Sequence, residues 1–278
     1  MSTSDFNKFC IKRYQEIYKA SFPKNKKATE VFERAAQKKA IRDTAIEALQ
    51  LYKDIEAEKI WQAIYAAHVH RKSGVVDVRV IDSVISADNS WKKSSGHAFE
   101  EAIEILGNTA LKGTGIKIYL QRNISLLIHN GSLGNEKRDI DWLRKQLKVS
   151  NFDLFMTVAQ ENTELLFACV QTKTSIRDRV TRDREPSILA MQSFLWSIAI
   201  VLDGSFMRLP KFQYMVNGGS PSFPTNGWHS LYVFSDKITL DRIFPIGTGL
   251  ATFVDHAKQA AKAWLTQRQW LDHNWRPI

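Results

Sequence analysis

Cysteine is scarce in this chain, with two residues, Cys10 and Cys169, among 278. Two cysteines cannot build a disulfide framework, no zinc-type Cys/His spacing occurs, and Cys169 lies in an apolar run that suits a buried thiol. The longest apolar segment, residues 188–202, contains Gln192 and two serines and is too short to span a bilayer. The N-terminus has no apolar core of signal-peptide length, so we expect the protein in a reducing cytoplasm.

Acidic residues are in deficit. There are 29 Asp and Glu residues against 39 Lys and Arg residues, which gives a formal net charge of +10 and a pI of about 9.5. This balance favours a polyanionic partner, either nucleic acid or an acidic membrane surface. A basic protein without such a partner is the alternative. The hydrophobic content of 44% and charged content of 24% are ordinary for a soluble globular protein.

The first quarter of the chain has a helical pattern. Apolar residues recur at helical spacing over residues 5–70, which predicts an N-terminal helical subdomain over residues 1–74. His68 and His70 form an HxH pair, but no third ligand is near in the sequence, and the end of a helix is the favoured interpretation. The β-branched residues 75–85 then predict a strand that opens a second domain, residues 75–278. The polar residues 86–96 predict a loop in which Lys92 and Lys93 either meet a phosphate backbone or are simply exposed.

Residues 96–106 predict a helix that carries two adjacent glutamates. At about 100° per residue, Glu101 falls opposite the apolar stripe of this helix, while Glu100 lies on its flank. Glu100 is therefore the better candidate for a half-buried functional carboxylate. The alternative is that both glutamates belong to a solvated helix surface.

The rest of the chain predicts a mixed α/β domain with a central sheet. Short strands are predicted at residues 116–120, 124–128, 212–216 and 231–234, and helices at residues 141–147, 186–203 and 258–271. The helix over residues 186–203 would begin at Pro186 and stop at Gly204. Because it is apolar nearly all round, it is expected in the core or at a subunit interface.

A hairpin between residues 151 and 184 organises the candidate chemistry. Two apolar runs, 154–158 and 165–170, flank the polar AQENTE and predict antiparallel strands that turn near Asn162. This register lays Asp153 opposite Lys173, on the face shared with Gln171, and a slip of one residue would separate them. One or two carboxylates can hold Mg²⁺ beside a phosphate, while a lysine orients the attacking water. An Asp–Lys pair of this kind is also a plain ion pair in many proteins.

The same stretch resembles the PD-(D/E)xK nucleases, and within them the type II restriction endonucleases that recognise sites with a CCGG core. The matched motifs are FD at 152–153, QTK at 171–173 and KTSIRDR at 173–179, with GHAFEE at 96–101 preceding them. The resemblance implies a restriction-endonuclease-like central mixed sheet flanked by helices. It also implies Mg²⁺ as cofactor, double-stranded DNA with a CCGG-containing palindrome as substrate, a homodimer, and a bacterial cytoplasm.

The resemblance assigns roles at the metal site. Asp153 resembles the metal-binding aspartate, and Lys173 resembles the lysine beside the attacking water. Glu100 resembles the helix glutamate that supports the metal site, and Glu101 remains its competitor.

One position departs from the general pattern. Most of the superfamily has Asp or Glu where this chain has Gln171, so Gln171 cannot supply a second anionic ligand. Enzymes of the CCGG group similarly lack that acid and use a glutamate displaced onto the following helix. Glu185, at the start of the predicted helix that begins with Pro186, fits that displaced position and suits the N-terminal end of a helix.

Arg177, Asp178 and Arg179 resemble the recognition element of the CCGG group. An arginine can donate two hydrogen bonds to guanine O6 and N7, and an aspartate can accept from cytosine N4 in the major groove. A phosphate-binding or salt-bridged surface is the alternative for this trio. The basic residues considered for contacts to the DNA backbone are Arg182, Arg184, Lys92 and Lys93.

Two other functions stay open on the sequence alone. One is another nuclease of the same fold, for repair or junction resolution. The other is a DNA-binding regulator without catalysis, in which Asp153 and Lys173 form only a structural ion pair.

Overall fold

The computed structural model describes residues 3–22, 29–73, 78–175, 180–203, 209–234, 240–247 and 249–278. The chain divides into two compact units, Met1–Ala102 and Ile103–Ile278. This division lies within helix α4 (Val78–Ala110), further along the chain than the boundary predicted after residue 74. Residue 74 lies outside the described residues. No helix in the described ranges is long and apolar enough to cross a membrane.

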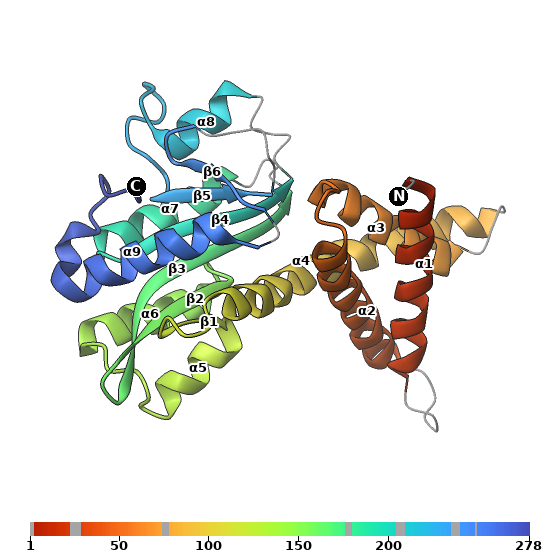
Figure 1. The fold of residues 1–278 in the computed structure, drawn as a ribbon, viewed down its shortest axis with the longest axis horizontal. Helices are drawn as coiled ribbons and strands as arrows, with labels where there is room; N and C mark the ends of the chain where they lie inside the picture. Colours follow the sequence, from red (N-terminus) through yellow and green to blue (C-terminus); the bar gives the residue numbers. More distant parts are fainter. Residues whose placement is uncertain are drawn as a thin grey trace. The chain divides into compact units, whose positions relative to one another are not determined.

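The first unit is built from helices, which confirms the predicted N-terminal helical region. Its helices are α1 (Thr3–Ala20), α2 (Glu30–Leu51), α3 (Ala57–Ser73) and the first part of α4 (Figure 1). His68 on α3 is buried between Tyr14, whose hydroxyl lies 2.6 Å from its Nδ1, and the carbonyl of Ala87, 3.1 Å from its Nε2. Burial lowers the pKa of His68 to about 4. This histidine is therefore a neutral core residue bonded to protein partners.

Helix α4 corrects two predictions. Residues 78–85 were predicted as strand and 86–96 as loop, and both segments are helical, so Lys92 and Lys93 lie on a helix. The predicted helix over residues 96–106 is confirmed as the second half of α4. The β propensity of a β-branched run depends on its context, and here residues 78–85 form the first turns of a 33-residue helix whose later turns bury Phe99, Ala102 and Ile103.

The described residues of the second unit form a six-stranded mixed sheet in the order β1-β2-β3-β4-β5-β6. Its strands are β1 (Ile116–Leu120), β2 (Leu154–Gln160), β3 (Thr163–Ser175), β4 (Trp196–Asp203), β5 (Ser230–Val233) and β6 (Ile243–Pro245). The pairs β1/β2 and β2/β3 are antiparallel, and the pairs from β3 to β6 are parallel. This arrangement confirms the predicted central mixed sheet.

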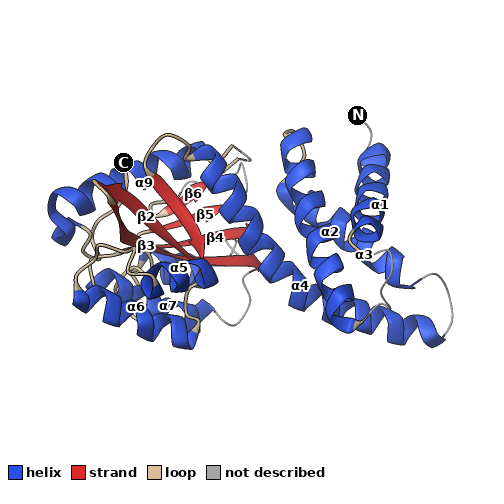
Figure 2. Ribbon diagram, turned by 90° about the horizontal axis from the view of Figure 1, so that it is seen from below, coloured by secondary structure: helices blue, strands red, loops and turns tan. Residues whose placement is uncertain are grey.

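Helices cover both faces of this sheet, as Figure 2 shows. On one face, α5 (Gln121–His129), α6 (Lys137–Val149) and α7 (Val180–Gln192) pack on apolar side chains that include Phe155 and Cys169. On the other face, α9 (Ala251–Gln267) brings Phe253 against Trp196 and Tyr232. The 3₁₀ turn Arg268–Trp270 follows α9, so the predicted helix over 258–271 is confirmed in its main part.

Three predicted elements of the second unit are wrong. Residues 124–128 belong to α5 and residues 212–216 to α8 (Pro210–Asn217), and neither is a strand. The helix predicted over 186–203 is instead the end of α7 followed by strand β4. An unbroken apolar run suits a central parallel strand buried on both faces as well as a buried helix, and hydrophobic periodicity does not separate the two.

Candidate active site

The hairpin of β2 and β3 places the candidate catalytic residues at one end of the sheet. The predicted turn near Asn162 is confirmed, and the strands pair from Gln160↔Thr163 to Leu154↔Val170 with an irregularity between Met156 and Thr157. Continuing this register sets Asp153 opposite Gln171, so the predicted pairing of Asp153 with Lys173 is two residues off. The two side chains still meet, because diagonal neighbours on an antiparallel pair lie within reach of a long side chain.

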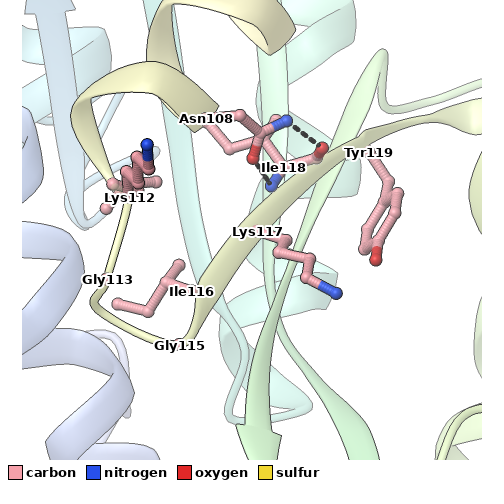
Figure 3. A pocket seen from close by; sticks show the side chains of 9 residues that line it. Asn108, Lys112, Gly113, Gly115, Ile116, Lys117, Ile118 and Tyr119 are labelled. Carbon is pink, nitrogen blue, oxygen red and sulfur yellow. Dashed lines mark hydrogen bonds between the residues drawn. The ribbon is translucent and has the colours of Figure 1, made fainter.

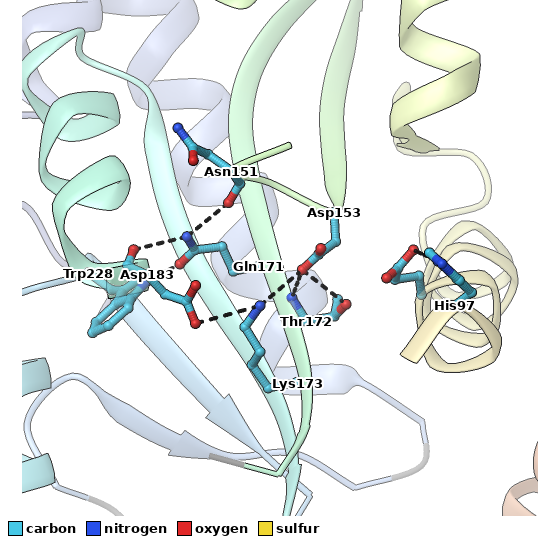
Figure 4. A network of polar contacts seen from close by, with 9 residues as sticks. His97, Asn151, Asp153, Gln171, Thr172, Lys173, Asp183 and Trp228 are labelled. Atoms are coloured by element: carbon cyan, nitrogen blue, oxygen red, sulfur yellow. Dashed lines mark hydrogen bonds and ion pairs between the residues drawn. The ribbon is translucent and has the colours of Figure 1, made fainter. Parts of the chain in front are cut away.

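Lys173 joins two carboxylates at this end of β3. Its Nζ lies 3.7 Å from Oδ2 of Asp153 and 3.6 Å from Oδ2 of Asp183, and Figure 4 shows the two aspartates approaching it from opposite sides. The main-chain N–H of Thr172 donates to the same Oδ2 of Asp153 at 2.7 Å. All three charged side chains are part-exposed, at 21% for Asp153, 31% for Lys173 and 24% for Asp183. They are open to a ligand from solvent.

The sequence did not single out Asp183. It lies in the first turn of α7, where the positive end of the helix dipole favours an anion. A helix beginning at Val180 would have indicated Asp183 by this signal, but the proline at position 186 suggested a later start.

Gln171 is a buried residue of β3, two residues before Lys173. Its side chain is 1% exposed, and its Nε2 donates to the carbonyls of Asn151 at 3.0 Å and Asp183 at 2.9 Å. Its Oε1 accepts from Nε1 of Trp228 at 2.8 Å. The amide therefore uses both N–H groups and its oxygen on three separate segments of the chain.

The donor chemistry of this cluster fits a hard divalent cation. Asp153 and Asp183 offer carboxylate oxygens around one ammonium, so the position already balances negative charge with a cation. No group of three or more His, Cys, Asp or Glu side chains with metal-binding geometry occurs among the described residues. Two carboxylates suffice for Mg²⁺, which keeps several waters and also binds substrate phosphate.

A pocket of about 330 Å³ lies elsewhere, between the end of α4 and the edge strand β1 (Figure 3). The amide of Asn108 closes part of that edge, because its Nδ2 donates to the carbonyl of Ile118 and its Oδ1 accepts from the N–H of Ile118, both at 2.8 Å. The pocket adjoins Ile116, which pairs with Val158 at the far end of the β1–β2 ladder from Asp153. Its lining contains no carboxylate, so we assign it no part in the candidate site.

Comparisons with known proteins agree with this architecture. A family model described as BsaWI restriction endonuclease type 2 matches residues 133–270, which include β2, β3 and α7. The chain is 51% identical to a protein in a crystal structure of a pre-specific restriction endonuclease BsaWI–DNA complex, with a TM-score of 0.70 over 98% of each chain. The chain belongs to the BsaWI family of type II restriction endonucleases. It is thus a DNA-cutting hydrolase.

A second solved structure supports the fold. The restriction endonuclease AgeI in a specific DNA complex matches 90% of this chain and 91% of its own, with a TM-score of 0.55 and 16% sequence identity. At that identity the likeness shows the fold alone, and it confirms the restriction endonuclease fold predicted for this member of the BsaWI family. No match was found among proteins with curated functional descriptions.

Glu185 lies elsewhere in this endonuclease than the sequence suggested. It is an exposed residue in the interior of α7, because the helix begins at Val180 and runs through Pro186. The carboxylate in the first turn of that helix, which meets Lys173, is Asp183. Asp183 therefore occupies the kind of position expected for Glu185.

The two glutamates of α4 differ in burial in the opposite sense to the prediction. Glu101 is 6% exposed and forms ion pairs with Lys38 and, at 2.9 Å, Arg42. Burial alone would raise the pKa of Glu101, but the hydrogen bonds from Lys38 and Arg42 outweigh it and lower that pKa. Glu100 is more accessible and lies 3.2 Å from Nδ1 of His97. Glu101 is committed to cations of its own unit, and a functional role for Glu100 stays a prediction.

The predicted DNA-contacting residues fall into three groups. Arg177, Asp178 and Arg179 lie outside the described residues, as do the side chains of the α4 lysines, Lys92 and Lys93. Arg182 is exposed on α7. Arg184 contacts protein atoms.

Arg184 bonds the end of α8 and the loop that leads into β5. Its Nε donates to the carbonyl of Met215 at 3.2 Å, its Nη2 donates to the carbonyl of Thr225, and its guanidinium lies 5.3 Å from the ring centre of Phe223. Burial lowers the pKa of Arg184. A contact of Arg184 with a DNA phosphate stays a prediction.

Proposed function

We propose that this endonuclease makes Mg²⁺-dependent double-strand cuts in DNA at a palindrome with a CCGG core, acting as a homodimer. The observation that carries the chemistry is the approach of two carboxylates, Asp153 and Asp183, to the single ammonium of Lys173. A two-fold palindrome calls for a two-fold protein, which supports the homodimer.

Each residue of the cluster has a role in this proposal. Asp153 and Asp183 hold the divalent cation through carboxylate oxygens, and Lys173 donates to the attacking water or to a phosphate oxygen. The bound cation supplies Lewis acidity toward the phosphoryl oxygen and lowers the pKa of a bound water. Glu100 is proposed to support this site, and Glu185 is the alternative to Asp183 as the second carboxylate.

The proposal is tested by digesting one plasmid of known sequence with the enzyme in Mg²⁺ and sequencing the fragment ends. We expect discrete fragments whose ends all map to sites with a CCGG core, and none when EDTA replaces Mg²⁺. The matched control is the same plasmid with each CCGG core changed to CGCG, which should stay intact. Random nicking or the absence of fragments would contradict the proposed specificity.

Recognition of the core is proposed to rest on Arg177, Asp178 and Arg179, which lie between the end of β3 and the start of α7. Each arginine can pair bidentately with a guanine, and Asp178 can accept from cytosine. The support is their match to the recognition motif and their place next to Lys173 in the sequence.

Arg177→Ala is expected to weaken binding to a CCGG duplex by about 10- to 100-fold more than binding to a random duplex, because a bidentate pair contributes about 1–3 kcal/mol of discrimination. Arg179→Ala should behave in the same way. Binding is measured by gel shift without Mg²⁺ on both duplexes at two salt concentrations. The control Arg182→Ala should weaken both duplexes equally and reduce the salt dependence. The same uniform loss in Arg177→Ala would make that arginine a phosphate contact.

A further inference from the structure

Gln171 stands at the position where the superfamily has an acid, two residues before Lys173. Its side chain is almost completely buried and makes three hydrogen bonds, to the Asn151 carbonyl, the Asp183 carbonyl and the Trp228 indole. These partners come from three different segments: the chain just before β2, the first turn of α7, and the chain just before β5. A glutamine that only filled the core would not need hydrogen bonds to three separate segments.

We propose that Gln171 is a positioning residue that sets where the two metal-binding carboxylates stand. One of its N–H groups holds the backbone of Asp183 itself, and the other holds Asn151, two residues before Asp153. Lys173 on the same strand touches both carboxylates. The Gln171 amide thus holds the backbone of Asp183 and the backbone just before Asp153. This inference rests on the proposed metal site.

The geometry requires an amide at this position. Nε2 faces two carbonyl oxygens at 2.9 and 3.0 Å, and these oxygens can only accept hydrogen bonds. An ionised carboxylate would place an oxygen against them and leave two buried acceptors repelling it. The amide at position 171 and Asp183, whose carboxylate lies on α7, are therefore linked by a direct hydrogen bond to the Asp183 main-chain carbonyl. Gln171 does not bind the metal in this proposal. It bonds the backbone of α7, the helix that carries the proposed ligand Asp183.

The third partner of Gln171, Trp228, is itself buried and hydrogen-bonded. Trp228 is 2% exposed, and its carbonyl accepts from Nδ2 of Asn226 at 2.9 Å. Arg184, the residue after Asp183, bonds the neighbouring carbonyl of Thr225. A Cβ added to Gly227 would lie 2.5 Å from the carbonyl oxygen of Met215, so this loop fits closely against α8. The loop before β5 and the first half of α7 are held together at successive residues.

The test compares Gln171→Met, which keeps the length of the side chain and removes its hydrogen bonds, with the unmodified enzyme. Three quantities are measured: the Ca²⁺ affinity by calorimetry, the Mg²⁺ concentration for half-maximal plasmid cleavage, and the melting temperature. We expect Gln171→Met to weaken Ca²⁺ binding and raise the half-maximal Mg²⁺ concentration by about 10-fold or more, the usual effect of losing an outer-shell partner of a metal site. Gln171→Glu should be no better than Gln171→Met.

Asn135→Leu is the matched control. The Asn135 amide also bonds the backbone of β3, through the carbonyl and the N–H of Leu166, at the end of the strand away from Lys173. This variant should lower the melting temperature and leave both metal measurements unchanged. If Gln171→Met gives that same pattern, Gln171 is only structural and the inference is overturned. Tighter metal binding by Gln171→Glu would also overturn it, because position 171 would then act as a ligand.

Trp228→Phe keeps the test decisive if Gln171→Met does not fold. It removes one hydrogen bond of the Gln171 amide and retains an aromatic ring, so the metal affinity should fall by about threefold, in line with one neutral hydrogen bond. Unchanged affinity in a folded Trp228→Phe would overturn the inference. An unmodified enzyme that shows no Mg²⁺-dependent cleavage would overturn the proposed function and the inference with it, whereas a cleaving enzyme with insensitive variants overturns the inference alone.

Discussion

Asp153→Ala is expected to slow plasmid cleavage in Mg²⁺ by about 10³-fold or more, the order of effect seen when a central electrostatic group is removed from an active site. Asp153 is oriented by the N–H of Thr172 at 2.7 Å and faces Lys173, so its loss removes one of the two carboxylates proposed to hold the cation. Binding of a CCGG duplex should stay measurable by gel shift, because base recognition is assigned to other residues.

Lys173→Ala should slow cleavage by a similar factor. The substitution removes the Lys173 ammonium, which contacts both Asp153 and Asp183. It also removes the proposed hydrogen-bond donor to the attacking water. The matched control is Lys258→Ala, which breaks an exposed Lys–Asp pair with Asp255 on α9, with N and O at 3.5 Å. That variant should cleave normally. Cleavage retained in Asp153→Ala and Lys173→Ala would contradict the assignment of the site.

The hairpin was predictable because strands and turns leave strong local signals. Two apolar runs around a polar centre fixed β2 and β3, and the two-residue alternation of a strand put Gln171 and Lys173 on one face. The register was wrong by two residues, because the polar AQENTE does not fix which residues close the turn: the strands close at Gln160↔Thr163, and the irregularity between Met156 and Thr157 then shifts the pairing by one residue. The contact of Asp153 with Lys173 survived this error because a lysine side chain reaches a diagonal neighbour.

The helix after the hairpin was not predictable to the same degree. Pro186 suits a first turn, yet α7 begins at Val180 and includes this proline in its interior. The apolar residues that follow match the pattern of the same helix, whereas they form the buried parallel strand β4. Because α7 begins at Val180, its first turn contains Asp183, whereas the predicted start at Pro186 had placed Glu185 there. Which of the two carboxylates holds a metal stays a prediction.

The role of Gln171 depends on contacts that no local pattern encodes. Its three partners lie 20, 12 and 57 residues away in the sequence. The sequence therefore showed only that an expected acid was missing. The structure shows that both polar atoms of the amide are hydrogen-bonded to distant segments. Gln171 is therefore interpreted as a residue that positions the proposed metal site, and not only as a mismatch to the motif.

The second carboxylate is decided by comparing Asp183→Asn with Glu185→Gln. Both changes neutralise one charge with almost no change of shape, and both lie on α7. Asp183→Asn is expected to slow cleavage by about 10²- to 10³-fold, because it removes a charge that lies 3.6 Å from Lys173. The cleavage rate of Glu185→Gln should stay within a few-fold of the rate of the unmodified enzyme. Glu185 is exposed to solvent and lies in a middle turn of α7.

Single-turnover cleavage rates over a range of Mg²⁺ concentrations distinguish the two positions. If Asp183 is a ligand, Asp183→Asn should need more Mg²⁺ and should not reach the full rate even at saturation, because an amide oxygen is a weaker ligand for a hard cation than a carboxylate. The opposite pattern, an inactive Glu185→Gln and a nearly normal Asp183→Asn, would restore the assignment suggested by the motif.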